Sequence, residues 1–185
     1  MRPTRLAWIS AVSVMLLGGC ASLVDQFAQS FGQPVVVTGN DTSPPAPTLE
    51  IPDYGYGAQV LHPGDAALSL PIRMTDRFFV VGAAEDPEGV KGVRIEGEAE
   101  LDCTNGSGIG ELRIFGPIIV SDVDSTGIGG SALTRRWLPT VVDPTLYPCT
   151  AGFTARSLTI TLRAVGTNFA GAETATPPVQ FVWNP

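Results

Sequence analysis

Histidine is almost absent from the sequence, and its shortage counts against a class of enzyme. The single histidine, His62, lies in the turn-like segment Leu61-His62-Pro63-Gly64-Asp65, and no G-x-S-x-G nucleophile motif accompanies it. A Ser–His–Asp relay would have to use this residue. The sequence therefore argues against a hydrolase of that type, and we expect His62 to be a surface turn residue.

Lysine is equally scarce, occurring once, at Lys91, in a chain of 11 basic and 18 acidic residues with a formal net charge of −7. Such a chain lacks the basic surface with which proteins contact the phosphates of nucleic acid. It also lacks the polybasic segment that would attract it to anionic lipid. We therefore expect no nucleic-acid partner.

Helical periodicity is missing as well. After residue 32 no convincing apolar pattern with a 3.6-residue period occurs, whereas glycine (21) and proline (16) are abundant. No internal repeat is visible. This profile is typical of an all-β domain with many turns.

The N-terminus carries the pattern of a secretory signal peptide, a basic segment followed by a short apolar run. Arg2 and Arg5 precede the uncharged run 6–17, which is shorter than the roughly 20 residues of a membrane-spanning helix. Leu17-Gly18-Gly19-Cys20 then resembles the lipobox of bacterial lipoproteins. This resemblance implies that residues 1–19 are a signal peptide and that Cys20 is acylated. An ordinary signal peptide that happens to contain a cysteine is the alternative.

The lipoprotein resemblance also implies a location. Stable anchoring takes at least two acyl chains, and proteins of this kind carry two or three, so the acyl chains of the mature N-terminus would hold the protein on a membrane of the bacterial cell envelope. Ala21, rather than aspartate, follows Cys20, which resembles an outer-membrane rather than an inner-membrane address. Loss of residues 1–19 removes two basic residues, so the mature net charge is 9 − 18 = −9.

The mature chain divides into a tether over 20–47 and a folded domain over 48–185. Apolar residues recur at four-residue intervals in the tether, at Leu23, Phe27 and Phe31. This spacing predicts either a short amphipathic helix on the membrane surface or, equally, a disordered linker. Residues 38–47 are polar and proline-rich, which predicts a spacer without a core of its own.

With Cys20 assigned to lipid, Cys103 and Cys149 remain, and in an exported protein we expect this pair to form a disulfide. The two residues are 46 positions apart without histidine neighbours. Zinc sites instead supply their ligands in closely spaced pairs. We therefore predict neither a metal site nor a cofactor at these cysteines.

Several segments alternate between apolar and polar residues, as strands with one buried face do. The clearest are 93–101, 158–164 and 179–183. Segment 68–72 alternates too, but Pro71 lacks an N–H group and places this strand at a sheet edge. Residues 78–84 are apolar throughout, which predicts a central strand.

The dipeptide Asn105-Gly106 predicts a hairpin between strands at 93–103 and 109–115. A loop of two residues, 105–106, and a loop of four, 105–108, both pair apolar residues of one strand with apolar residues of the other. The sequence does not choose between them. In either case Cys103 points inward, so a bridge to Cys149 would join elements at one end of the domain.

Two longer stretches resemble bacterial immunoglobulin-like domains. Residues 80–93, VVGAAEDPEGVKGV, resemble the passage from strand B to strand C, and 158–171 resemble strand F with its following turn, although Thr167 stands where that family often has aspartate. The resemblance implies an immunoglobulin-like antiparallel β-sandwich. The predicted disulfide is not the bridge between strands B and F of antibody domains.

Acidic residues are the only candidates for a metal site or for carboxylate-based catalysis. Calcium candidates are the turn with Glu85, Asp86 and Glu88 and the pair Asp122 and Asp124. Glu96, Glu98 and Glu100 alternate along one strand, about 6.7 Å apart, which is too far for one ion. In each case we expect solvated carboxylates, and we predict no metal.

Aromatic residues are the best binding candidates. Tyr54, Tyr56 and Trp137 are the residues that could present a ring to a protein or glycan partner. We expect a structural, adhesive or binding module of the cell envelope that is not an enzyme and has no cofactor. The alternative is a small envelope hydrolase with a carboxylate-based site.

Overall fold

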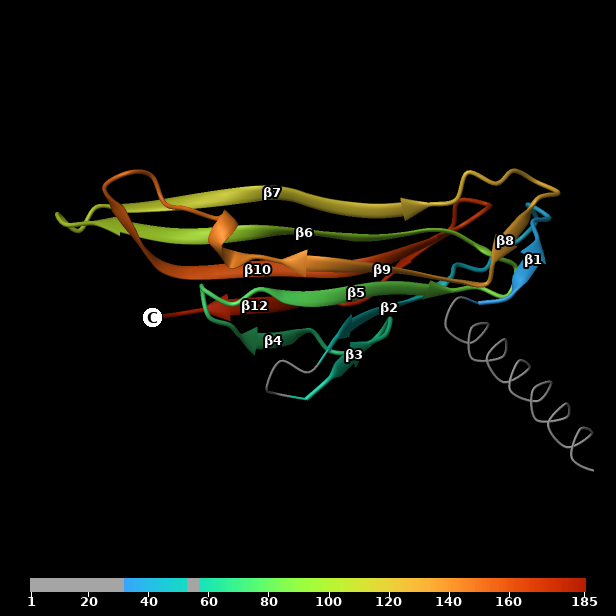
Figure 1. Ribbon diagram of the computed structural model, residues 1–185, viewed down its shortest axis with the longest axis horizontal. Helices are drawn as coiled ribbons and strands as arrows, with labels where there is room; N and C mark the ends of the chain where they lie inside the picture. The colour runs from blue at the N-terminus through green and yellow to red at the C-terminus, as the bar shows by residue number, and fades with distance from the viewer. Residues whose placement is uncertain (1–31, 53–56) are drawn as a thin grey trace, which may run out of the picture.

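The computed structural model describes residues 32–52 and 57–185, where the regular structure is β-strand except for one short 3-10 helix (Figure 1). One sheet consists of β2 (Ala46–Ile51), β3 (Gln59–Leu61), β5 (Phe78–Glu85) and β9 (Arg135–Val142). A second consists of β4 (Leu68–Pro71), β6 (Val90–Asn105), β7 (Gly110–Val123), β10 (Phe153–Asn168), β11 (Glu173–Ala175) and β12 (Val179–Trp183). A small sheet pairs β1 (Pro34–Val36) with β8 (Ser131–Leu133), and a 3-10 helix, η1 (Pro144–Leu146), follows β9.

The strand orders are β3-β2-β5-β9 and β4-β12-β10-β6-β7, with β11 paired to β10. All pairs are antiparallel except β4 with β12, which run parallel. The two large sheets share one core, so the fold is a β-sandwich. This confirms the all-β sandwich predicted from the sequence. Among the described residues no helix has the length and apolar character needed to cross a membrane.

The core lies where the inward side chains of the two large sheets meet. Side chains with no exposed surface come from both sheets: Leu49, Val80, Ile95, Leu101, Leu158 and Ile160. The rings of Phe78 on β5 and Phe181 on β12, with centroids 4.6 Å apart, join the sheets directly. Full burial of one such side chain contributes about 1.5–3 kcal/mol, so this layer holds the sheets together.

The strands predicted by alternation are present. Segments 93–101, 158–164 and 179–183 lie within β6, β10 and β12, and β6 and β10 pair over most of their 16 residues each. The segment with Pro71 forms the edge strand β4, paired only with β12. The apolar run 78–84 forms β5, which lies between β2 and β9 as a central strand should.

The hairpin between β6 and β7 differs from both predicted loops. Thr104 pairs with Gly110, so five residues, 105–109, connect the strands. The Asn105 side chain accepts hydrogen bonds from the backbone N–H groups of Ser107 and Ile109, and Gly108 adopts a positive φ of 77°. Relative to the predicted pairings, the register from Thr104 to Ala99 is shifted by an odd number of residues, which turns the β7 side chains of this part, Leu112 and Ile114 among them, to the other face of the sheet. The predicted pairing of apolar with apolar residues is therefore wrong.

Ordered structure begins before the predicted boundary at Thr48. β1 pairs with β8, Val37 is buried, and Asp41 is almost fully buried. The Asn168 amide donates hydrogen bonds to the backbone oxygens of Asp41 and Ser43. Residues 34–47 are thus docked on the domain, because a proline-rich segment without a core can still be held by specific hydrogen bonds. The predicted signal peptide, Cys20, and the tether up to residue 31 lie outside the described residues.

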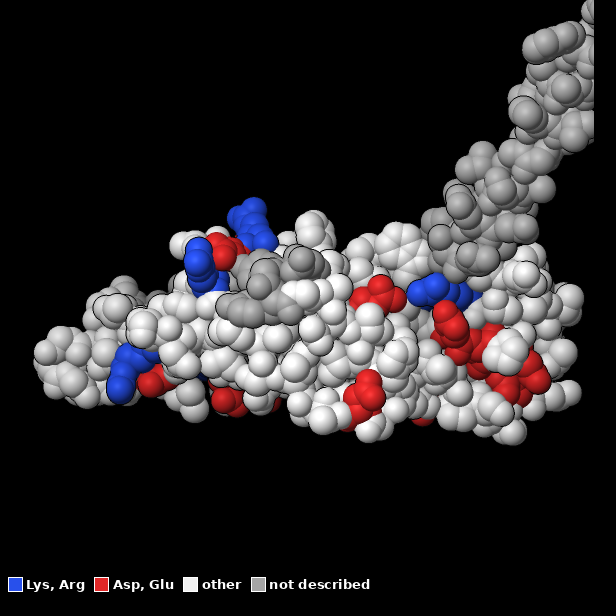
Figure 2. Space-filling model, turned by 90° about the horizontal axis from the view of Figure 1, so that it is seen from below, with Lys and Arg blue, Asp and Glu red and all other residues white. Residues whose placement is uncertain are grey.

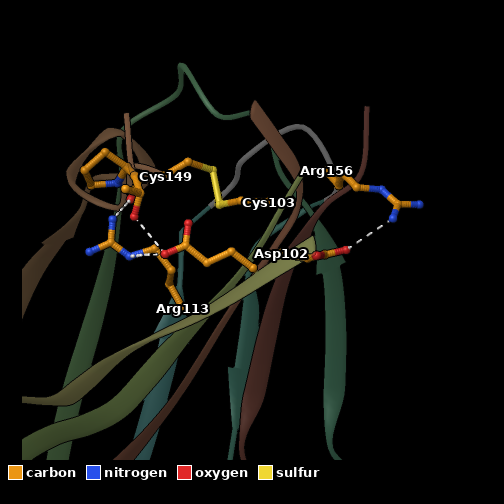
Figure 3. The surroundings of a disulfide bond; sticks show 8 residues. Asp102, Cys103, Arg113, Cys149 and Arg156 are labelled. Carbon is orange, nitrogen blue, oxygen red and sulfur yellow. Dashed lines mark hydrogen bonds and ion pairs between the residues drawn. A yellow bond between two sulfur atoms is a disulfide. The ribbon is translucent and has the colours of Figure 1, made fainter. Parts of the chain in front are cut away.

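Cys103 and Cys149 form a disulfide, with Cα atoms 6.0 Å apart, which confirms the predicted pairing (Figure 3). Cys103 is buried near the end of β6, and Cys149 lies between η1 and β10. Nearby, the Arg113 guanidinium on β7 donates a hydrogen bond to the Pro148 carbonyl. The bridge therefore joins one end of the six-stranded sheet to the segment that crosses from one sheet to the other.

Candidate functional site

The outer face of the four-stranded sheet carries a group of apolar side chains that we call the apolar sheet face. Inward residues of β5 and β9, such as Phe78 and Val142, enter the core, so their neighbours in sequence point outward. The strand register then places Phe79 opposite Val141 and Val81 opposite Pro139. The members of the apolar sheet face are Val60, Phe79, Val81, Trp137, Pro139 and Val141.

These side chains are unusually exposed for their type. The exposed fractions are 59% for Phe79, 53% for Val141, 50% for Val60 and 40% for Trp137. Single exposed apolar residues are ordinary on protein surfaces, whereas a continuous group of them marks a site of interaction. Figure 2 views the edge of the sandwich where β3 and β4 lie, beside the apolar sheet face, and most of the visible surface of this edge is uncharged.

Charged residues lie at one border of the apolar sheet face and also within it, where Glu50 on β2 stands between Val60 and Val81. Arg135, the first residue of β9, lies opposite Glu85 and pairs with its carboxylate at 3.2 Å (Nε to Oε1). The same guanidinium reaches Glu50 on β2 at 3.4 Å (Nη2 to Oε1). Arg135 is thus shared by two carboxylates, one at the border and one, Glu50, inside the group of apolar side chains.

The sequence identified one member of this group and missed the others. Trp137 lies in the apolar sheet face, whereas Tyr54 and Tyr56 are outside the described residues. Phe79 was hidden because both faces of β5 are apolar, so the run 78–84 shows no alternation. In β9 the exposed residues alternate with inward ones, and that alternation was the available signal.

The predicted calcium candidates have other roles in the structure. Glu85 pairs with Arg135, and the Arg136 guanidinium pairs with both Asp122 and Asp124. Burial raises the pKa of Asp124, but hydrogen bonds from Thr126 and Arg136 more than offset this effect and leave it below its ordinary value. No group of three or more His, Cys, Asp and Glu side chains in the described part of the chain is arranged to hold a metal ion.

Asp86 is the acidic residue with the most perturbed environment. Its side chain is buried, Oδ1 accepts a hydrogen bond from the Glu88 backbone N–H, and Oδ2 has no hydrogen-bond partner among residues 32–52 and 57–185. Burial raises the pKa of Asp86 to about 6, and the neighbouring Asp41 carboxylate adds to the effect. A pKa near the working pH suits a general acid, but a group buried in this way cannot touch a substrate.

His62 lies in the turn that follows β3, as expected. Its side chain is exposed, and its backbone N–H donates a hydrogen bond to the Asp65 carboxylate at 2.7 Å (N to Oδ2). The contact is thus made by the main chain and orders the turn.

No protein-family model matches the chain, and no curated protein sequence matches it. The arrangement of side chains on the two sheets must therefore carry the functional argument.

Proposed function

We propose that this protein is a lipid-anchored binding module of the bacterial cell envelope and that its apolar sheet face binds a protein partner. The observation that carries the proposal is the apolar sheet face itself, with two aromatic side chains, Phe79 and Trp137, on a rigid sheet. Aromatic side chains in such a position supply most of the energy in many interfaces, because they bury a large area with little loss of side-chain entropy.

The free energy gained by burying the apolar sheet face is large enough to support recognition of a partner. Full burial of an exposed apolar side chain contributes about 1.5–3 kcal/mol, so covering four half-exposed side chains contributes roughly 4 kcal/mol before the cost of association. The polar and neutral residues around the group would form the rim of an interface, which normally buries about 800 Å² on each partner.

A protein partner fits this surface better than a glycan. Sugar rings stack on aromatic faces but also require several hydrogen-bonding groups beside them. The charged group within the apolar sheet face, Glu50, is already paired with Arg135. Aliphatic residues such as Val60 and Val141 instead favour an apolar protein surface.

The strand order supports the immunoglobulin-like part of the proposal. In such domains strands A, B and E belong to one sheet, and strands G, F and C to the other, with an added C′ strand in the variable type. If β2, β5 and β9 are taken as A, B and E, the chain order makes β6, β7, β10 and β12 strands C, C′, F and G. In the observed sheets β2, β5 and β9 are adjacent in one sheet, and β12, β10, β6 and β7 are adjacent in the other, as this assignment requires.

The anchor rests on the N-terminal sequence. The basic residues, the apolar run and Leu17-Gly18-Gly19-Cys20 together support acylation at Cys20. The residues that follow Cys20 would then link the domain to the membrane. The absence of a basic footprint supports a partner other than nucleic acid.

Site-specific photo-crosslinking in the native host tests the proposal. A photoreactive residue at Val141 should capture one defined protein, and the same residue at Leu146 on η1, which is also exposed, should not. Substitution Phe79→Thr together with the Val141 probe should reduce capture. Capture of a glycan, or equal capture from both positions, would contradict the proposed protein partner. Turnover of generic esterase or glycosidase substrates would favour the hydrolase alternative.

A further inference from the structure

A second exposed surface lies on the outer face of the six-stranded sheet, whereas the apolar sheet face belongs to the four-stranded sheet. Four aliphatic side chains of β7 are exposed by 58–65%: Leu112, Ile114, Ile119 and Val123. The hairpin register turns Leu112 and Ile114 outward, and the second register shift, between Gly97 and Ala99, leaves Ile119 and Val123 on the same outer face. β7 ends its sheet, and among the described strands only β6 pairs with it.

Acidic side chains of β6 lie directly beside this aliphatic row. Leu112 pairs with Asp102, Ile114 with Glu100, and Ile119 with Glu96. These residues alternate with the buried inward side chains of β6, so their carboxylates share the outer face with the aliphatic row. We call the two columns together the acidic-aliphatic strip, and its central members are Glu98, Glu100, Asp102, Leu112 and Ile114.

The negative charge of the acidic-aliphatic strip is not balanced at its centre. Glu96 is neutralised by Arg94 and Arg163. Asp102 has one distant cation, Arg156, at 3.9 Å (Nη1 to Oδ2). Glu98 and Glu100 are exposed, and no ion pair joins either one to a basic group of the described chain.

The same charges exclude several occupants. A second copy of this chain would bring its own carboxylates against Glu98 and Glu100, and like charges in contact oppose association. Pro117 offers no backbone N–H, and a register shift between Gly97 and Ala99 interrupts the ladder there, which are two features that protect edge strands from pairing with themselves. Nucleic acid and anionic lipid are repelled by the same carboxylates.

We propose that the acidic-aliphatic strip binds a basic amphipathic segment of a partner protein, with aliphatic side chains on the β7 column and lysine or arginine on the β6 column. The columns are neighbouring strands about 4.8 Å apart, and successive outward residues repeat every 6.7 Å or so. The aliphatic part of a partner's lysine or arginine side chain can pack on Ile114 while its charged group contacts Glu100, because these two residues are paired across the strands. The inference does not rest on the apolar sheet face and adds a second, electrostatically selective surface.

The test uses the full mature domain and two synthetic peptides. The first is a fluorescently labelled 14-residue amphipathic peptide with leucines on one face and lysines on the other. The second has the same composition in scrambled order. Fluorescence anisotropy at low ionic strength should show binding of the first peptide, at least tenfold weaker binding of the second, and loss of affinity as salt rises.

Variants locate the binding. Glu98→Gln with Glu100→Gln should weaken the amphipathic peptide by about threefold to tenfold, as expected for two exposed ion pairs, and Ile114→Thr should weaken it as well. A control with the same charge change elsewhere, Asp76→Asn with Glu88→Gln, should bind as the unsubstituted protein does.

Two results would overturn the proposal: equal weakening in the control, which would mean attraction to net charge only, or equal binding of the scrambled peptide. Sedimentation showing dimers that Ile114→Thr dissociates would assign the strip to a second copy instead. Photo-crosslinking at Val141 is unaffected by these variants, so failure here leaves the proposed function standing.

Discussion

Phe78 and Phe79 are consecutive residues of β5 with opposite environments. Phe78 is buried and contacts the ring of Phe181 across the core, whereas Phe79 is exposed by 59% and lies opposite Val141 on the outer face. One of the two rings holds the sheets together, and the other is available to a partner.

This difference predicts that the same substitution has a large effect on stability at one position and a small effect at the other. Phe78→Ala should lower the free energy of unfolding by about 3–5 kcal/mol, because it leaves a cavity between the sheets. Phe79→Ala should change it by about 0.5 kcal/mol or less. Chemical denaturation of both variants measures the two values. A large loss at Phe79 would mean that this ring belongs to the fold and is not an interaction surface.

The disulfide predicts a specific loss of stability. Closing a loop across the 46 positions between Cys103 and Cys149 stabilises by roughly 4 kcal/mol in the chain-entropy treatment. Replacing both cysteines by serine should lower the denaturant midpoint accordingly. Thiol labelling of the unfolded but unreduced domain should leave both residues unmodified. Full labelling of the two would show that the bridge does not form.

The buried Asp86 predicts that the free energy of unfolding differs between the unsubstituted protein and the Asp86→Asn variant by an amount that depends on pH. Because burial raises the pKa of Asp86 from 3.8 to about 6, the folded state holds this proton more tightly than the unfolded state does. The protonated Asp86 therefore contributes favourably to the free energy of unfolding at low pH, and this contribution is lost as the pH rises through about 6. Above that pH the buried carboxylate costs roughly 1–3 kcal/mol.

Asp86→Asn keeps an oxygen for the Glu88 N–H and adds an amide beside Asp41. It should raise the free energy of unfolding at pH 7 by roughly 1–3 kcal/mol, with the gain shrinking toward pH 4. Denaturation at several pH values compares the two proteins, with Asp76→Asn at a partly buried position as the control. A gain of the same size at every pH would contradict the linkage to Asp86.

Cys20 predicts a covalent modification. Mass spectrometry of the N-terminal peptide from the native host should find an acylated Cys20 as the first residue, and Cys20→Ala should leave the chain unacylated and uncleaved at this site. A free Cys20 thiol in the unsubstituted protein would remove the lipid anchor from the proposed function while leaving both surfaces of the domain in place.

What the sequence determined by itself is local. Alternation in 93–101 and 158–164, with no competing helical period, was enough for the all-β class and for the long strands β6 and β10. The disulfide could be predicted because the chain has three cysteines, and the N-terminal motif assigns one of them to lipid. In an exported chain the remaining two are expected to pair.

The tertiary structure alone decided which faces are presented. A register shift in the β6–β7 hairpin turned Leu112 and Ile114 outward, and the apolar sheet face required β9, which is distant in sequence, to pair with β5 in the sheet β3-β2-β5-β9. Docking of residues 34–47 depended on Asn168, more than 120 residues away along the chain. Alternation fixes two faces for each strand, but only pairing between distant strands selects what each face meets, and local sequence contains little information about that choice.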